Sequence, residues 1–81
     1  QNQPNPFNQT TIIRFALSAE VKTANIVIRN LNGEQLKVIA LNQTGKGQVT
    51  INANELAQGT YTYTLIVNGE SVDTKLMVVT K

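Results

Sequence analysis

The chain offers few side chains that could catalyse a reaction or bind a metal. It contains no histidine and no cysteine, which removes the commonest general base, the commonest metal ligand and the thiolate nucleophile. Its serines, Ser18 and Ser71, do not lie in the glycine-flanked turn that exposes a nucleophilic serine. The carboxylates fall mostly beside predicted turns, where a solvated charge is the ordinary interpretation. We therefore expect no enzyme activity, no metal and no cofactor. The acidic residues are Glu20, Glu34, Glu55, Glu70 and Asp73.

Charge and hydropathy exclude two further classes of function. Seven basic and five acidic residues give a formal net charge of +2, and the basic residues stand singly along the chain. Phosphate backbones are bound by clustered Lys and Arg, so nucleic acid is not an expected partner. Gly45 and Gly47 lie between predicted strands rather than before a helix, so they form no phosphate-binding loop. No apolar run approaches the roughly 20 residues of a membrane-spanning helix.

Alternation of apolar and polar residues predicts strands over most of the chain. In the first run, Ile13, Phe15 and Leu17 share one face. Residues 60–67 alternate most regularly, which indicates a central strand. The last run is apolar on both faces from residue 76 to residue 79, so we expect its end to be well covered. The predicted strands are residues 10–17, 24–30, 35–41, 48–52, 60–67 and 71–80.

The segments between these runs predict turns and one corner. Asn32-Gly33 and Asn68-Gly69 each separate two predicted strands, which is the strongest short signal for a β-hairpin. The polar residues 42–47 interrupt the pairing. Residues 54–59 are too few for a helix that stands alone, so we interpret them as a corner that crosses between sheets and ends at Gly59, where glycine permits a positive φ.

These elements predict an all-β chain, an immunoglobulin-like antiparallel β-sandwich of six or seven strands. The cysteine pair and the tryptophan of antibody domains are missing. We expect residues 1–8 to form an extended lead-in segment rich in Pro and Asn, and residues 9–81 to form a single sandwich domain. Such sandwiches serve in adhesion, sugar binding, transport signals and spacing, so the fold alone does not assign a function.

Two aromatic features allow both a functional and a structural interpretation. Tyr61 and Tyr63 could form a platform that stacks on sugars, although two inward-facing tyrosines on a central strand are more often part of the core. Residues 56–61 could form a recognition surface, although Leu-x-x-Gly-x-Tyr is also what a corner followed by a core strand requires. The structural interpretation is favoured in both cases.

Several motifs, taken in order, resemble one family. They are Gln-Asn-Gln-Pro-Asn-Pro-Phe-Asn at residues 1–8, Thr-Ile-Ile-Arg-Phe-Ala-Leu at 11–17, Asn-Gly at 32–33, Leu-Ala-Gln-Gly-Thr-Tyr at 56–61 and Lys-Leu-Met-Val-Val-Thr-Lys at 75–81. This set is similar to the type A C-terminal sorting domain (Por secretion tail) of the Bacteroidetes type IX secretion system. A related family, the immunoglobulin-like domain of flagellar hook-capping proteins, shares the Asn-Pro-Phe-Asn start and the Gly-x-Tyr corner.

The resemblance implies a non-catalytic secretion signal. Such a domain follows an N-terminally fused cargo domain, passes through the periplasm and is recognised by the outer-membrane translocon. A sortase-like protease then removes it, and the cargo reaches the cell surface or the medium. The rival interpretation is a structural module, or a carbohydrate-binding and adhesive one, in a surface protein.

The resemblance also implies which residues the translocon reads. The family's glycine-tyrosine corner falls on Gly59 and Tyr61, and its basic C-terminal strand falls on the segment that contains Lys75 and Lys81. An exposed last strand can add to the edge of a partner's sheet, or to a second copy in an edge-strand dimer. Equally, the lysines can be charges that protect the edge from pairing. The expected recognition residues are Gly59, Tyr61, Lys75, Leu76, Met77, Val78, Val79 and Lys81.

Overall fold

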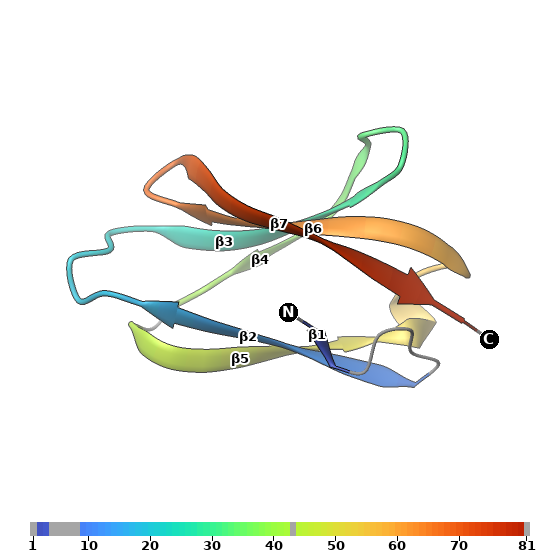
Figure 1. Ribbon diagram of the computed structural model, residues 1–81, viewed down its shortest axis with the longest axis horizontal. Helices are drawn as coiled ribbons and strands as arrows, with labels where there is room; N and C mark the ends of the chain where they lie inside the picture. Colours follow the sequence, from blue (N-terminus) through green and yellow to red (C-terminus); the bar gives the residue numbers. More distant parts are fainter. Residues whose placement is uncertain (1, 4–8, 43, 81) are drawn as a thin grey trace.

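The computed structural model describes residues 2–3, 9–42 and 44–80, and these residues form two antiparallel sheets packed as a sandwich (Figure 1). One sheet has the strand order β1-β2-β5, and the other has the order β4-β3-β6-β7. The described residues include no α-helix and one 3₁₀ turn, η1. This confirms the predicted all-β sandwich. The elements are β1 (Asn2–Gln3), β2 (Thr10–Leu17), β3 (Ala24–Asn30), β4 (Gln35–Ala40), β5 (Gly45–Asn52), η1 (Ala53–Glu55), β6 (Gly59–Val67) and β7 (Glu70–Val79).

One predicted strand is longer than expected. β5 begins at Gly45 rather than at residue 48. Its ladder with β2 runs without a break from the pair formed by Thr10 and Asn52 to the pair formed by Leu17 and Gly45. The two glycines therefore do not interrupt the pairing, because an antiparallel ladder needs only their backbone groups. Gly47 lies opposite Phe15, so an aromatic side chain from the neighbouring strand lies beside the position that lacks a side chain.

The hairpin between β6 and β7 forms at Asn68-Gly69 as predicted. Both residues have positive φ, +51° at Asn68 and +84° at Gly69, as a two-residue turn of type I′ requires. The Asn68 side chain has a second role, because its Oδ1 accepts hydrogen bonds from the backbone N–H groups of Lys22 (2.8 Å) and Thr23 (3.1 Å). The turn is therefore tied to the loop that precedes β3.

The core lies between the sheets and includes residues that the alternation assigned to the inner faces, such as Ile26, Ile28 and Ile51, together with residues it did not assign, such as Met77 and Val79. Ile26, Ile28, Ile51, Met77 and Val79 are at most 1% exposed, and each such side chain contributes about 1.5–3 kcal/mol of hydrophobic stabilisation. The core cluster also includes Ile13, Ala53, Leu56, Tyr61 and Tyr63.

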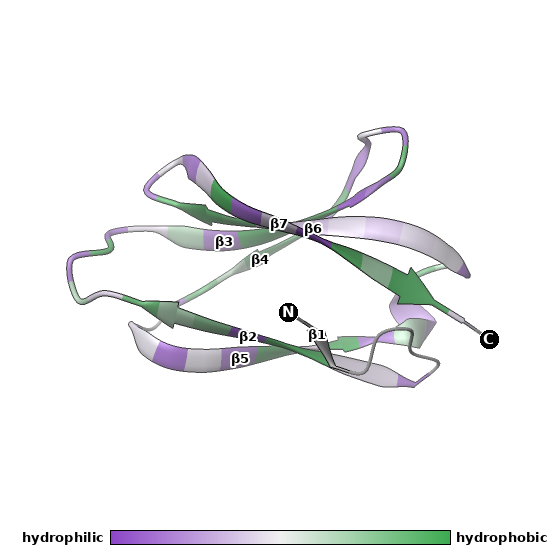
Figure 2. Cartoon of the chain, in the orientation of Figure 1, coloured by the Kyte–Doolittle hydropathy of each residue, from purple (hydrophilic) through white to green (hydrophobic). Residues whose placement is uncertain are grey.

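The end of the last strand is not covered as the sequence predicted. β7 is an edge strand that pairs only with β6 among the described strands. Met77 and Val79 are buried, but Leu76 on the opposite face is 58% exposed. An apolar run on both faces suggested a strand covered on both sides, whereas one face of β7 remains open because neither described sheet packs against it. Figure 2 shows this half of β7 as hydrophobic.

Among the described strands, two sides of the sandwich have no strand that joins the two sheets. On one side, β4 and β5 are the edges of their sheets and are joined by the short connection 41–44. On the other side lie β7 and the two-residue strand β1, which pairs with Ile12 and Ile13 of β2. Residues 1 and 4–8 of the expected lead-in segment lie outside the described residues, so its boundary at residue 8 stays a prediction.

Candidate functional site

The expected recognition residues, except Lys81, lie in one ladder between β6 and β7. Gly59 is opposite Val79, and Tyr61 is opposite Met77. Segments 59–61 and 77–79 are thus neighbours in space although they are far apart in the chain. Lys81 lies outside the described residues.

The last strand divides these residues between two faces. Met77 and Val79 point into the core and are 0% and 1% exposed, so a partner cannot contact their side chains while the domain is folded. Leu76 and Val78 point away from the core; Leu76 is exposed and Val78 is half-buried. Only the outward residues of the strand are therefore available for recognition.

The Gly-x-Tyr corner is a structural element. η1 carries the chain from β5 in one sheet to β6 in the other, which confirms the predicted crossing. Tyr61 is 6% exposed, and its hydroxyl donates a hydrogen bond to the carbonyl oxygen of Ala57. A tyrosine that bonds back to the backbone a few residues upstream is a known corner device in immunoglobulin-like sandwiches. Tyr61 is therefore buried and secures the corner, and whether the translocon reads it stays a prediction.

Lys75 points toward the opening between the sheets. It lies opposite the core residue Tyr63, and its Nζ is 3.8 Å from Oδ2 of Asp73. A cavity of about 40 Å³ lies here, lined by Ile13, Phe15, Asp73 and Lys75 among others. This volume suits one or two water molecules rather than an organic ligand.

Both edges of the four-stranded sheet carry the features that natural sheets use to prevent edge pairing. The pairing register between β6 and β7 shifts, because Leu65 pairs with Asp73 while the next residue, Ile66, pairs with Ser71. Val72 therefore has no opposite residue in β6 and forms a bulge in β7. In β4 a similar shift makes Leu36 the extra residue. Bulges and inward-pointing charges both hinder strand addition.

The inward-pointing charge of β4 matches that of β7. Lys37 lies opposite the core residue Ile28, and its Nζ is 3.0 Å from Oε1 of Glu55. Each edge of this sheet therefore combines a bulge, an inward lysine and a carboxylate partner. We call β4 and β7 the protected edges.

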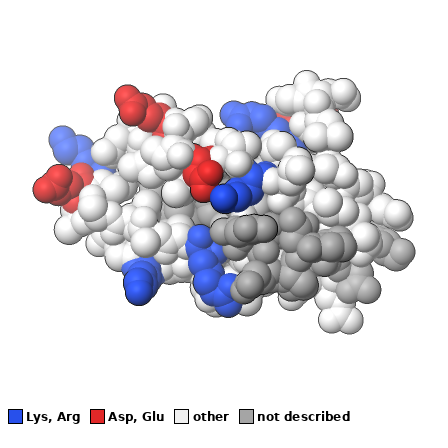
Figure 3. All heavy atoms as spheres, in the orientation of Figure 1, with Lys and Arg blue, Asp and Glu red and all other residues white. Residues whose placement is uncertain are grey.

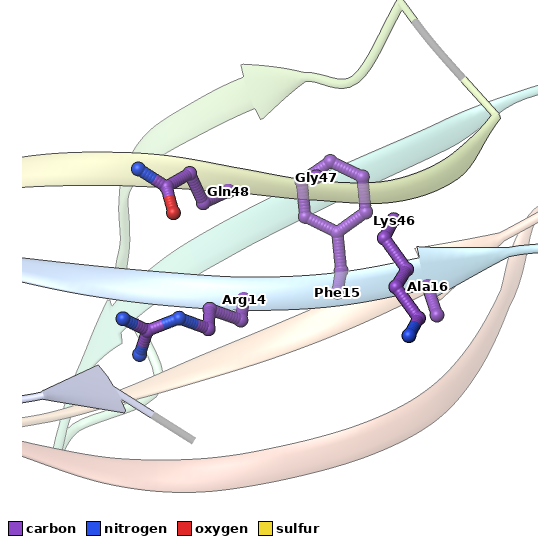
Figure 4. Close-up of a pocket in the computed structure, with 6 residues that line it drawn as sticks. All are labelled: Arg14, Phe15, Ala16, Lys46, Gly47 and Gln48. Atoms are coloured by element: carbon purple, nitrogen blue, oxygen red, sulfur yellow. The ribbon is translucent and has the colours of Figure 1, made fainter.

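A shallow hollow on the three-stranded sheet was not predicted from the sequence (Figure 4). It has a volume of about 650 Å³ and lies over β2 and β5, where Arg14 pairs with Gln48 and Ala16 pairs with Lys46. We call it the β2–β5 hollow. Alternation in both strands could have indicated that Arg14 and Lys46 share the outer face, but their pairing register is not visible in the sequence. The hollow is lined by Arg14, Phe15, Ala16, Lys46, Gly47 and Gln48.

The described residues contain no cluster of metal-ligating side chains. No three His, Cys, Asp or Glu side chains within the described ranges lie close enough together to hold a metal ion. Across residues 2–3, 9–42 and 44–80, no helix is long and apolar enough to cross a membrane. Tyr61 and Tyr63 are buried, so they cannot form the sugar-stacking platform that the sequence left open. Figure 3 shows charged side chains of both signs spread over the face in view, some of them next to a side chain of opposite charge.

Comparison with known proteins gives one match. The family model described as a secretion system C-terminal sorting domain matches residues 3–79, which is nearly the whole chain. No curated protein and no solved structure matches this chain.

Proposed function

The chain belongs to the family of secretion system C-terminal sorting domains, and we propose that it directs an N-terminally fused cargo through the outer-membrane translocon of the type IX system. Members of this family are sorting signals for type IX secretion, so the protein that carries this domain is secreted or displayed at the cell surface. The match over residues 3–79 is the observation that carries the proposal, because it spans both sheets of the sandwich.

The outward face of β7 is the part of the signal that we propose the translocon contacts. Leu76 is 58% exposed although it is a large apolar residue, and Val78 lies beside it on the same face. Exposed apolar residues grouped on a folded surface mark interaction sites. In this proposal Met77, Val79 and Tyr61 act only by holding the strand in place.

The second part of the proposal is that a sortase-like protease removes the domain after export. The support for this step is the resemblance of the whole chain to sorting domains, since the family's domains are separated from their cargo at the cell surface. Mass spectrometry of the exported cargo tests the step. We expect cargo that lacks residues 1–81 in a competent host and full-length fusion in a host without the protease; full-length fusion in both hosts would contradict the proposal.

Export of a reporter tests the sorting function. Residues 1–81 are fused behind a fluorescent protein that reaches the periplasm, and the fusion is expressed in a type IX-competent host and in a translocon mutant. We expect fluorescence in the medium or on the surface of competent cells only. Reporter retained in the periplasm of both hosts would refute the sorting function and leave a structural module as the alternative.

A pair of matched variants tests the contact face. Leu76 and Val72 both lie on β7 and are almost equally exposed, 58% and 56%. We expect Leu76→Asp to reduce export at least tenfold and Val72→Asp to leave it within twofold, while thermal unfolding shows both variants folded. Equal export of the two variants would show that the translocon does not contact this part of the strand.

A further inference from the structure

We infer that the free edge of β5 binds an extended acidic segment of a partner protein by strand addition. β5 lies at the end of its sheet, and no described strand pairs with its outer edge. Such an edge presents a row of backbone N–H and C=O groups that can hydrogen-bond to an added strand. This inference is independent of the secretion role, because it concerns a different sheet from the one that carries the last strand.

β5 lacks the features that protect the other long edges. Its eight residues pair with β2 in an uninterrupted register, so it has no bulge along its length. Its one charged residue, Lys46, lies opposite Ala16 on the outer face rather than pointing between the sheets. β4 and β7 each have a bulge and an inward lysine. Of the three long edges among the described strands, β5 is therefore the one that can accept a regular antiparallel or parallel neighbour.

The charge of this sheet selects an acidic partner. β1, β2 and β5 contain Arg14 and Lys46 but no Asp or Glu. Lys46 lies in the strand that would be next to an added segment, and Arg14 lies one strand further on the same face (Figure 4). Opposite charges on neighbouring strands stabilise pairing, and like charges directly opposite each other destabilise it. Outward side chains of the added segment should therefore be carboxylates.

The inner face selects apolar residues in alternation with the acidic ones. Val49 on β5, Ile39 on β4 and Leu41 just after β4 pack against the core but are only partly buried, and β4 and β5 are the edge strands on this side of the sandwich. A strand added to β5 would lie over this side and bury them further. The occupant is thus an extended segment with apolar residues on one face and acidic residues on the other.

A second copy of this chain fits the edge less well. Pairing β5 with β5 would place two Lys46 side chains and two Arg14 side chains on one continuous sheet face, with no carboxylate from either copy. The self-pairing sheet would therefore bring like charges together on one face, which disfavours this pairing.

A peptide-binding experiment with the chain 1–81 tests the inference. The probe is a labelled peptide of eight residues, the length of β5, in which Glu and Val alternate. We expect binding by fluorescence anisotropy, amide shift changes in β5 rather than in β7, and weaker binding at high salt because salt screens the charge pairing. Shift changes confined to β7, or no binding at low salt, would overturn the inference.

A charge swap gives the matched control. Lys46→Glu should weaken binding of the Glu-Val peptide about fivefold or more and should create binding of a Lys-Val peptide that the unmodified chain does not bind. Lys75→Glu on the protected edge β7 should change neither result. Sedimentation of the chain alone is expected to show a monomer at the peptide-binding concentration. If the chain instead forms a dimer, and the Lys46→Asp substitution abolishes that dimer, the occupant of the edge is a second copy of the chain and the proposal is overturned.

Discussion

β5 and β7 are both edge strands, yet they differ in what protects them. Each begins with a mostly exposed half and has a buried core residue in its second half, Ile51 in β5 and Met77 in β7. β7 carries a bulge at Val72 and the inward-pointing Lys75, whereas β5 has a regular register. The comparison shows that exposure alone does not make a strand edge available for pairing.

The difference separates two modes of contact. The open face of β7 offers the side chains of Leu76 and Val78, while its edge is hindered by the bulge and the lysine. The edge of β5 offers backbone groups, while its outer face offers positive charge. The two proposed contacts therefore use different sheets of the sandwich.

The largest expected effect concerns the buried ends of the two strands. Met77→Ala and Ile51→Ala each remove a fully buried side chain, so each should lower the free energy of unfolding by about 2–5 kcal/mol. Leu76→Ala, the neighbouring outward residue, should cost less than about 1 kcal/mol. Denaturant unfolding measures all three. A cost at Leu76 equal to that at Met77 would show that the two faces of β7 are wrongly assigned.

The next effect concerns how each strand begins. β7 starts after the hairpin turn at Asn68, whose side chain accepts hydrogen bonds from the loop before β3. β5 instead starts after the connection from β4. Asn68→Ala loses both side-chain hydrogen bonds and strains a residue with φ of +51°, which should cost about 1–3 kcal/mol. Asn68→Gly keeps the turn geometry and should recover about 1 kcal/mol of this loss. Equal unfolding midpoints for the two variants would contradict a role for backbone strain.

A smaller effect concerns the corner that links the two regions. Tyr61→Phe removes the hydrogen bond from the hydroxyl to the carbonyl oxygen of Ala57 but keeps the buried ring. The free energy of unfolding should fall by about 0.5–1.5 kcal/mol. Reporter export should stay within twofold of the unmodified domain, since Tyr61 holds the corner and does not face a partner. Loss of export in a stably folded Tyr61→Phe variant would instead indicate direct recognition of the corner.

The smallest effect distinguishes the two ion pairs of the protected edges. Lys37 and Glu55 are 3.0 Å apart, whereas Lys75 and Asp73 are 3.8 Å apart and more exposed. Glu55→Gln should therefore cost about 0.2–1 kcal/mol and Asp73→Asn less. The difference should vanish in about 1 M salt, where exposed charges are screened. A cost at Asp73 that exceeds the cost at Glu55 would reverse the ranking of the two pairs.

Local pattern accounts for the parts of the fold that the sequence predicted well. The bounds of β2 and β3 and the hairpin at Asn68-Gly69 match the predictions, because alternation and positive-φ residues act within a few neighbouring residues. The start of β5 was predicted three residues too late, because Gly45 and Gly47 weaken a strand pattern without preventing backbone pairing. The resemblance of the ordered motifs to sorting domains was likewise visible in the sequence, and the family match confirms it.

The sequence by itself determined the fold class, the family, and which residues of each strand share a face. Only the tertiary structure decided which strands are edges, which of the expected recognition residues are buried, and which cations share a sheet face. Leu76 and Met77 are adjacent apolar residues, yet one is 58% exposed and the other is 0% exposed. The physical reason is that alternation is a property of one strand, whereas coverage depends on the neighbours that the other sheet places against it.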